Sequence, residues 1–489
     1  MEEIDAQKGR AIGIGREFSG AILGDARLEK RLSAIADQIS LKPAESFPVI
    51  FPEEADRESF YRFLRNPVVS WGKLIEPHYQ QTSKRAAEVA EVIAIHDSSK
   101  LQFQRKSRGD LGFISKGKKN DKVNTAGFLC HFCFAVSGET DSKPLGVLNV
   151  RPLRRLRKTK NTAKKRDREQ SSKAIERYES SKWLDGVKES RRRLAGLATV
   201  IHVMDREADY FALMAELVET SERFVIRVSH EKRKVQRGEE ISTISQALVN
   251  RPTICEREVF LSKRAIPRVG KPSKSNTDRP SRTARLTITA VSVGVKRPLR
   301  MLASEFPEAL ALNLVHVFEA NPPPSQDAVD WKLFTTEPIE TEEQILKVVD
   351  TYRKRWTIEE FFKALKTGCS YEDRQLESFK TITNALALML PIAWQMLVLR
   401  HHSRSEGPGR SVGVLNQTQL QILIALGKGR LNEQATNRQV LYAVAALGGH
   451  IKNNGAPGWL VIYRGLRELY AIERGVKLNA CAAQHVIND

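Results

Sequence analysis

Five short apolar runs, each bounded by polar residues, constrain the fold of this chain more than any other feature. They are VIAIHD (92–97), GFLCHFCFAV (127–136), PLGVLNV (144–150), LATVIHVMD (197–205) and FVIRV (224–228). Apolar runs of this length are typical of strands buried in a sheet. Helical patterns lie between the later runs, at Lys182–Leu194 and Ala208–Thr220. The sequence therefore predicts an α/β core built on a mixed sheet.

The segment before this core has a helical pattern. Gly24 and Asp25 precede apolar residues at helical spacing, which predicts an N-capped amphipathic helix, and ESFYRFLRNP predicts a second, shorter one. We expect the first 75 or so residues to form a basic helical module that contacts DNA phosphates. The basic residues that would make these contacts are Arg27, Lys30, Arg31 and Arg62.

The α/β rhythm stops after residue 228. The stretch KRAIPRVGKPSKSNTDRPSR is followed by RLTITAVSV, whose alternation predicts a half-exposed strand, so we expect a β-rich insertion. Helical patterns return afterwards and dominate the end of the chain. The predicted divisions are a basic helical domain at 1–75, an α/β core at 76–228 and 336–403, the insertion at 229–335, and a helical C-terminal domain at 404–489.

The charge of the chain favours a polyanionic partner. Its 79 Lys and Arg exceed its 58 Asp and Glu, for a formal net charge of +21. Nucleic acid is the first candidate partner and an anionic membrane surface the second. The basic block at 151–168 is compatible with either a solvated linker or a DNA contact.

Cysteine usage and hydropathy predict a cytoplasmic protein that does not cross a membrane. The 5 cysteines are scattered, and MEEIDAQKGR does not resemble a secretory signal. The most apolar run, Ala385–Leu399, is too short to span a bilayer, so we expect a buried helix. Cys130 and Cys133 form a CxxC without a second ligand pair at zinc spacing, and we interpret them as strand residues.

The stretch YRKRWTIEEFFKALKTG (352–368) carries an unusual mixture of charges. Apolar spacing from Ile345 onward predicts one continuous helix, on which Tyr352, Arg355, Glu359, Lys363 and Lys366 would share one stripe. An alternative interpretation is a solvated face with a Glu359–Lys363 ion pair.

Two of the predicted strands end in an acid, Asp97 and Asp205. Either one alone is more commonly a helix cap or a turn residue. Together with Glu359, however, they would supply the oxygen ligands for a pair of Mg²⁺ ions, and the surrounding basic residues would neutralise a DNA strand.

Several motifs together resemble a known family. Tyr352, Arg355, Glu359 and Lys366 have the spacing Y-x2-R-x3-E-x6-K, and MDREAD surrounds Asp205. With LGDARLEKRL, YRFLRNP, IHDSS, ESSKWL and WKLFTTEPIE, they make the sequence similar to the DDE transposases of bacterial insertion sequences, in the subgroup with the YREK signature.

The resemblance implies an RNase H-like core, interrupted by a β-rich insertion between the second and third acids. It implies cut-and-paste transposition, with cleavage of double-stranded transposon ends through a hairpin and joining to target DNA. Asp97, Asp205 and Glu359 would be the catalytic residues and would bind two Mg²⁺ ions, with Mn²⁺ able to substitute. The active species would be a homodimer in a synaptic complex.

The resemblance also implies specific DNA contacts. Trp331 would stack on an expelled base, while Arg227, Tyr352 and Arg355 would hold the bent phosphates. The alternative for Trp331 is a strand residue buried under the insertion. Two other functions stay open, namely a metal-dependent nuclease without strand transfer and a DNA-binding regulator without catalysis.

Overall fold

The structure is a computed structural model that describes residues 14–488 with internal gaps. The gaps fall at 104–109, 113, 115–125, 155–180, 262–279, 325, 403–414, 416, 428–430, 433 and 452–455. Apart from its first four residues, the basic block at 151–168 therefore lies outside the described residues.

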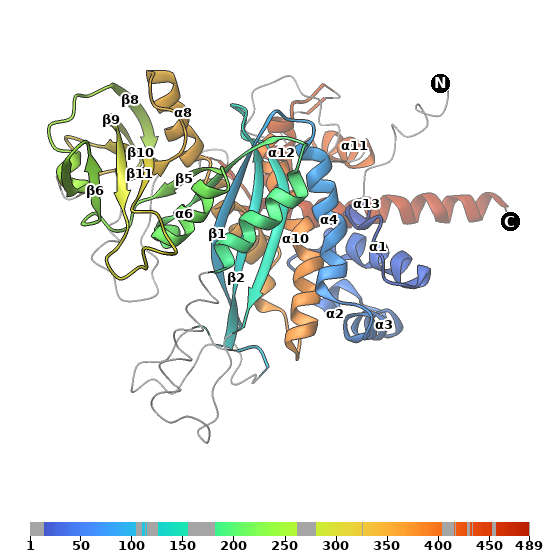
Figure 1. Ribbon diagram of the computed structural model, residues 1–489. Helices are drawn as coiled ribbons and strands as arrows, with labels where there is room; N and C mark the ends of the chain where they lie inside the picture. The colour runs from blue at the N-terminus through green and yellow to red at the C-terminus, as the bar shows by residue number, and fades with distance from the viewer. Residues whose placement is uncertain are drawn as a thin grey trace, which may run out of the picture.

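One mixed sheet runs through the described part of the chain (Figure 1). Its strand order is β3-β2-β1-β4-β5-β11-β10-β9-β6-β7, with β8 paired to β9. The first five strands along the chain are β1 (Glu91–Phe103), β2 (Ala126–Ser137), β3 (Pro144–Leu153), β4 (Thr199–Met204) and β5 (Arg223–Arg227). All five apolar runs therefore form strands, as predicted.

The pairing of these five strands defines the fold. Strands β1, β2 and β3 are antiparallel neighbours, whereas β4 lies parallel to β1 and β5 lies parallel to β4. This order and these directions are those of the RNase H-like core, which confirms the predicted fold class.

The insertion extends the same sheet. It contains β6 (Lys234–Arg237), β7 (Glu240–Thr243), α7 (Ile244–Ala247), β8 (Cys255–Leu261), β9 (Arg282–Lys296), β10 (Ala309–Phe318) and β11 (Asp330–Thr335). Strand β11 pairs antiparallel with β5, with Leu333 opposite Arg227. The last strand of the insertion therefore returns the chain to the core before the third acid.

Helices cover both faces of the core sheet. On one face, Ile93 and Ile95 of β1 belong to the same buried cluster as residues of α4 (Trp71–Ala86) and α10 (Phe379–His402). On the other face lie the helix at 181–194, η2 (Arg206–Ala208) and α6 (Phe211–Glu219). Strand alternation places Cys130 and Cys133 in different clusters, so the CxxC pair is part of a buried strand, as predicted.

The N-terminal helices pack against this core. They are η1 (Ile14–Phe18), α1 (Ala26–Leu41), α2 (Phe47–Ile50) and α3 (Glu54–Arg65). The predicted N-cap is present, because the Asp25 side chain accepts from the Arg27 amide. Glu17 of η1 contacts His78 at 2.6 Å and Arg85 at 2.7 Å, and both partners lie on α4. This partly buried ion network attaches η1 to α4.

Helix α10 is the buried helix predicted at Ala385–Leu399. Residues Phe379–His401 are long and apolar enough to cross a membrane, but 83% of their most apolar window is buried inside the protein. The helices that follow are α11 (Gln417–Ala425), α12 (Asn437–Leu447) and α13 (Trp459–Asn488). Figure 1 shows the end of α13 projecting away from the body of the protein.

Candidate active site

The parallel register of β1 and β4 brings two of the predicted acids together. The last paired residues are His96 and Met204, so Asp97 and Asp205 are the next residues on neighbouring strands. Asp205 directly follows β4 and begins the turn into η2, as predicted. The prediction that Asp97 also ends its strand is wrong, because β1 continues to Phe103 in its pairing with β2. What ends just before Asp97 is the pairing of β1 with β4, whose last pair is His96 and Met204.

The third acid comes from a helical segment that is not continuous. The predicted single helix is wrong, because the chain forms α8 (Glu342–Arg353), a turn at 354–355, α9 (Trp356–Lys363) and a π-helical turn, η3 (Ala364–Gly368). The amides of Arg355, Thr357 and Ile358 donate to carbonyls three residues earlier, which tightens the junction. Apolar spacing was a poor guide here, since backbone angles at Lys354 and Arg355 stay helical and the periodicity is hardly disturbed.

Arg355 and Tyr352 connect this junction to all three acids. The Arg355 guanidinium donates to Asp97 Oδ2 at 3.1 Å and to Glu359 Oε1 at 2.8 Å. The Tyr352 hydroxyl donates to Asp205 Oδ1 at 3.4 Å. The structure therefore brings Asp97, Asp205 and Glu359 into one site, with Tyr352 and Arg355 between them.

The pKa values in this cluster reflect burial and mutual repulsion. Burial raises the pKa of Asp97 to about 6; Arg355 opposes this shift, and the charges of Asp205 and Glu359 add to it. Burial alone would lower the pKa of Arg355, but Tyr352 and the three acids outweigh it and raise the pKa. The cluster thus holds an excess of negative charge around one buried cation.

The two lysines of the predicted stripe point elsewhere. Lys363 lies 2.8 Å from Glu360 Oε1, so the alternative Glu359–Lys363 ion pair is wrong. Lys366 lies on η3 and donates to the Lys100 carbonyl at 2.6 Å, at the far part of β1. Lys363 is the last residue of α9, whereas Lys366 lies on the π-helical turn that follows it.

Arg227 and Trp331 lie beside Tyr352 because β5 and β11 are neighbours. Arg227 donates to the Asp330 carbonyl at 3.2 Å. Trp331 packs edge-on against Tyr352, with ring centroids 5.7 Å apart. Both residues line the same groove as Arg355 and Glu359. The interpretation of Trp331 as a buried strand residue is only half right, because its side chain is partly exposed.

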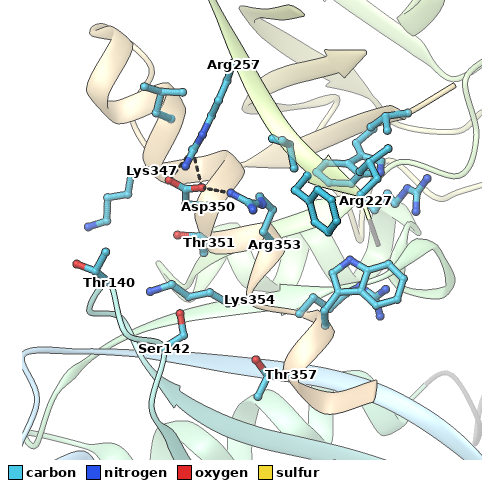
Figure 2. A pocket seen from close by; sticks show the side chains of 18 of the residues that line it. Thr140, Ser142, Arg227, Arg257, Lys347, Asp350, Thr351, Arg353, Lys354 and Thr357 are labelled. Atoms are coloured by element: carbon cyan, nitrogen blue, oxygen red, sulfur yellow. Dashed lines mark hydrogen bonds and ion pairs between the residues drawn. The ribbon is translucent and has the colours of Figure 1, made fainter. Parts of the chain in front are cut away.

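This groove has a volume of about 2250 Å³ and is bounded by the β2–β3 turn, β8, β11, α8 and α9. Figure 2 shows the part of the groove lined by α8, where Arg257 Nη1 lies 2.7 Å from Asp350 and Arg353 contacts the same acid. Sequence reasoning missed Arg257 and Asp350, because they are distant in the chain and belong to no motif. Trp356, 53% exposed on the groove wall, was overlooked as one more apolar residue of the helix.

Lys354 was also overlooked, although it anchors the junction. Its ammonium group donates to the carbonyls of Ser137 at 3.3 Å, of Glu139 at 2.6 Å and of Gly138. These carbonyls form the turn between β2 and β3. The run YRKRW contains three adjacent basic residues. Their order in the sequence does not show that Lys354 binds this turn while Arg355 binds the acidic cluster.

The basic residues of the N-terminal helices differ in their surroundings. Arg27, Lys30 and Arg62 are exposed on α1 and α3. Arg31 instead donates to the Asp56 carbonyl at 3.3 Å and lies 3.4 Å from its carboxylate, so it joins α1 to α3.

The donor set of the acidic cluster fits a hard divalent cation. Carboxylate oxygens are the ligands that Mg²⁺ and Mn²⁺ prefer, and three acids from three elements meet here. In the arrangement described, the guanidinium of Arg355 occupies the space between Asp97 and Glu359. The fit is therefore one of donor chemistry: as they stand, Asp97, Asp205 and Glu359 are not gathered closely enough to hold an ion, and neither is any other group of three acidic, histidine or cysteine side chains among the described residues.

The sheet is RNase H-like, and its acidic cluster lies where the pairing of β1 with β4 ends, beside a groove with basic and aromatic walls. These features define a class of enzymes that act on nucleic acid. Two family models identify the member of that class. Residues 77–394 match the transposase DDE domain, and residues 14–69 match the transposase DNA-binding domain. The chain belongs to the DDE transposase family, whose domains use divalent metal ions and act on DNA.

Proposed function

We propose that this transposase works by a cut-and-paste reaction and belongs to the YREK subgroup, in which its motifs resemble those of the transposase of transposon five. One observation carries the proposal. Tyr352 and Arg355 of the signature contact Asp205, Asp97 and Glu359, so the residues of the three motifs form one connected cluster.

In this proposal Asp97, Asp205 and Glu359 are the catalytic residues and hold two Mg²⁺ ions, for which Mn²⁺ can substitute. Such ions, when bound, activate the attacking oxygen and offset charge on the phosphate. The chain itself supplies the geometry, because the β1–β4 register fixes two acids and α9 brings the third to them.

The basic and aromatic residues of the signature, together with the neighbouring Lys363, would bind the DNA backbone beside this cluster. Tyr352, Arg355, Lys363 and Lys366 would contact phosphates. In the hairpin step, the free 3′ oxygen of the first cut strand bonds to a phosphorus of the opposite strand, and the bond from that phosphorus to the flanking DNA breaks. Arg227 and Trp331 would hold the bent strand, since both line the groove next to Tyr352.

The remaining regions would serve recognition and assembly in the cytoplasm. Residues 1–75 would bind the transposon end through Arg27, Lys30, Arg31 and Arg62, and residues 404–489 would hold two protomers together in the synaptic complex. The catalytic core would comprise 76–228 and 336–403, with 229–335 as its insertion. The outward projection of α13 in Figure 1 is compatible with contact to a second protomer.

The test is incubation of the protein with Mg²⁺, a labelled duplex carrying a terminal inverted repeat from the DNA that flanks the gene, and a supercoiled plasmid. A cut-and-paste transposase produces hairpin ends and labelled plasmid. A nuclease without strand transfer cuts the duplex but never labels the plasmid. A DNA-binding regulator gives complexes without cleavage.

A further inference from the structure

Arg355 is the cation around which the acidic cluster is arranged. Its side chain is only 6% exposed, although Arg355 is one of the residues that line the groove. One terminal nitrogen donates to Asp97 and the other to Glu359, at 3.1 Å and 2.8 Å. A single guanidinium therefore joins the acid of β1 to the acid of α9.

These two contacts use the carboxylates that the proposed metal ions need. A carboxylate can accept hydrogen bonds and coordinate a metal at the same time, but a guanidinium and a divalent cation of like charge repel each other at such short range. Asp97 and Glu359 would be among the residues that hold a divalent ion, and Arg355 would then compete with that ion for their carboxylates.

We propose that Arg355 is a displaceable internal counter-ion, which holds Asp97 and Glu359 in the DNA-free protein and leaves them when a DNA phosphate takes its guanidinium. This inference rests on the proposed function, since it assumes that the two acids are metal ligands. Divalent ions then bind weakly to the free protein and more tightly to its DNA complex. By linkage, metal and DNA raise each other's affinity by the same factor.

Within the described part of the chain, the guanidinium of Arg355 hydrogen bonds only to the two acids, Asp97 and Glu359. It stands at the α8–α9 junction rather than inside a regular helix, and its side chain caps neither helix. Its Nε is buried and, among the described residues, has no hydrogen-bond partner. A phosphate in the groove would offer the guanidinium a bidentate partner, which a planar fork of donors suits well.

The inference can be tested by Mn²⁺ binding to the whole protein without DNA, from the electron paramagnetic resonance signal of free Mn²⁺. Arg355→Gln removes the competing charge and keeps a polar side chain. We expect it to bind Mn²⁺ about tenfold more tightly than the wild type. Arg353→Gln is the matched control. It also removes a positive charge from the groove, but Arg353 pairs with Asp350 and not with the acidic cluster. Its Mn²⁺ affinity should stay close to that of the wild type.

A second arm uses only the wild type, so it does not depend on how the variant folds. A pre-cut duplex with a terminal inverted repeat should raise the affinity for Mn²⁺ about tenfold. Equal Mn²⁺ affinity of folded Arg355→Gln and wild type without DNA, or no effect of the duplex, would overturn the inference.

Ligand variants separate this failure from failure of the proposed function. If Asp97→Asn and Glu359→Gln abolish Mn²⁺ binding while Arg355→Gln does not strengthen it, the metal site stands and only the counter-ion role is lost. If Mn²⁺ binding is the same in both ligand variants as in the wild type, the metal-site assignment itself is wrong and the counter-ion role falls with it.

Discussion

The hydroxyl of Tyr352 donates to the carboxylate of Asp205 at 3.4 Å, although 147 residues separate them along the chain. Tyr352 is 2% exposed and lies in the last turn of α8, whereas Asp205 follows β4. The contact therefore joins the helix of the signature to the sheet that carries the other two acids. Because the ring also packs against Trp331, removal of the hydroxyl alone tests this contact without emptying the space.

Tyr352→Phe is expected to slow cleavage of a transposon end by about tenfold, because one hydrogen bond to the proposed catalytic acid Asp205 contributes roughly 1.5 kcal/mol. The free energy of unfolding should change by less than about 1 kcal/mol, since the aromatic packing is kept. Single-turnover cleavage and denaturant unfolding measure the two quantities. A full cleavage rate would show that the Tyr352–Asp205 contact has no catalytic role.

Replacement of Asp97, Asp205 or Glu359 by Ala should reduce cleavage by about 1,000-fold or more, because bound metal contributes several kcal/mol to transition-state stabilisation. Binding of the transposon end should persist in a gel-shift assay. Glu343→Gln, which changes an exposed acid lining the same groove, is the control and should cut at nearly the normal rate. Near-normal cleavage by any of the three Ala variants would remove that residue from the proposed ligand set.

Much of this arrangement was predictable from the sequence, since buried strands and the spacing of the signature are local patterns. The contacts of Arg355 were not predictable, because the α8–α9 junction interrupts the helix without disturbing its apolar periodicity. Lys363 pairs with Glu360 and not with Glu359, whose carboxylate accepts from Arg355. Asp97 lies within a long strand because β1 stays paired with β2 as far as Phe103. This pairing cannot be predicted from the sequence of β1 alone.

Arg27→Gln and Lys30→Gln should weaken binding of the transposon end, and each should lower the slope of log affinity against log salt by about 1, because one phosphate contact is lost. Both residues are exposed on α1. Lys188→Gln is the control, since this lysine is 52% exposed and lies beside Glu216, outside the N-terminal helices. Titrations at several salt concentrations give the slopes. Unchanged slopes for both variants would place recognition elsewhere on the protein.

Lys354→Met should lower the free energy of unfolding by about 2 kcal/mol, because three carbonyls of the β2–β3 turn lose a charged donor. Lys347→Met is the matched control on α8. Its side chain is 51% exposed and pairs with Glu91, so the loss should be within about 1 kcal/mol. Equal losses in denaturant unfolding for the two variants would mean that Lys354 does not anchor the junction.

The raised pKa of Asp97 predicts how stability depends on pH in the absence of metal. The pKa rises from 3.8 to about 6 on folding, so between these values the folded protein binds more protons at this site than the unfolded chain does. The contribution of Asp97 is therefore fully present below about pH 4 and is lost as the pH rises through 6.

Asp97→Asn removes this titration but keeps an oxygen that can accept from Arg355. Its free energy of unfolding, relative to that of the wild type, should increase by about 2.5 kcal/mol between pH 4 and pH 7, since one pKa unit corresponds to about 1.36 kcal/mol. Denaturant unfolding in EDTA at several pH values measures the difference. A difference that is constant across this range would show that Asp97 is ionised throughout. In that case the effect of Arg355, which lowers the pKa of Asp97, would outweigh burial and the two neighbouring carboxylates, which raise it.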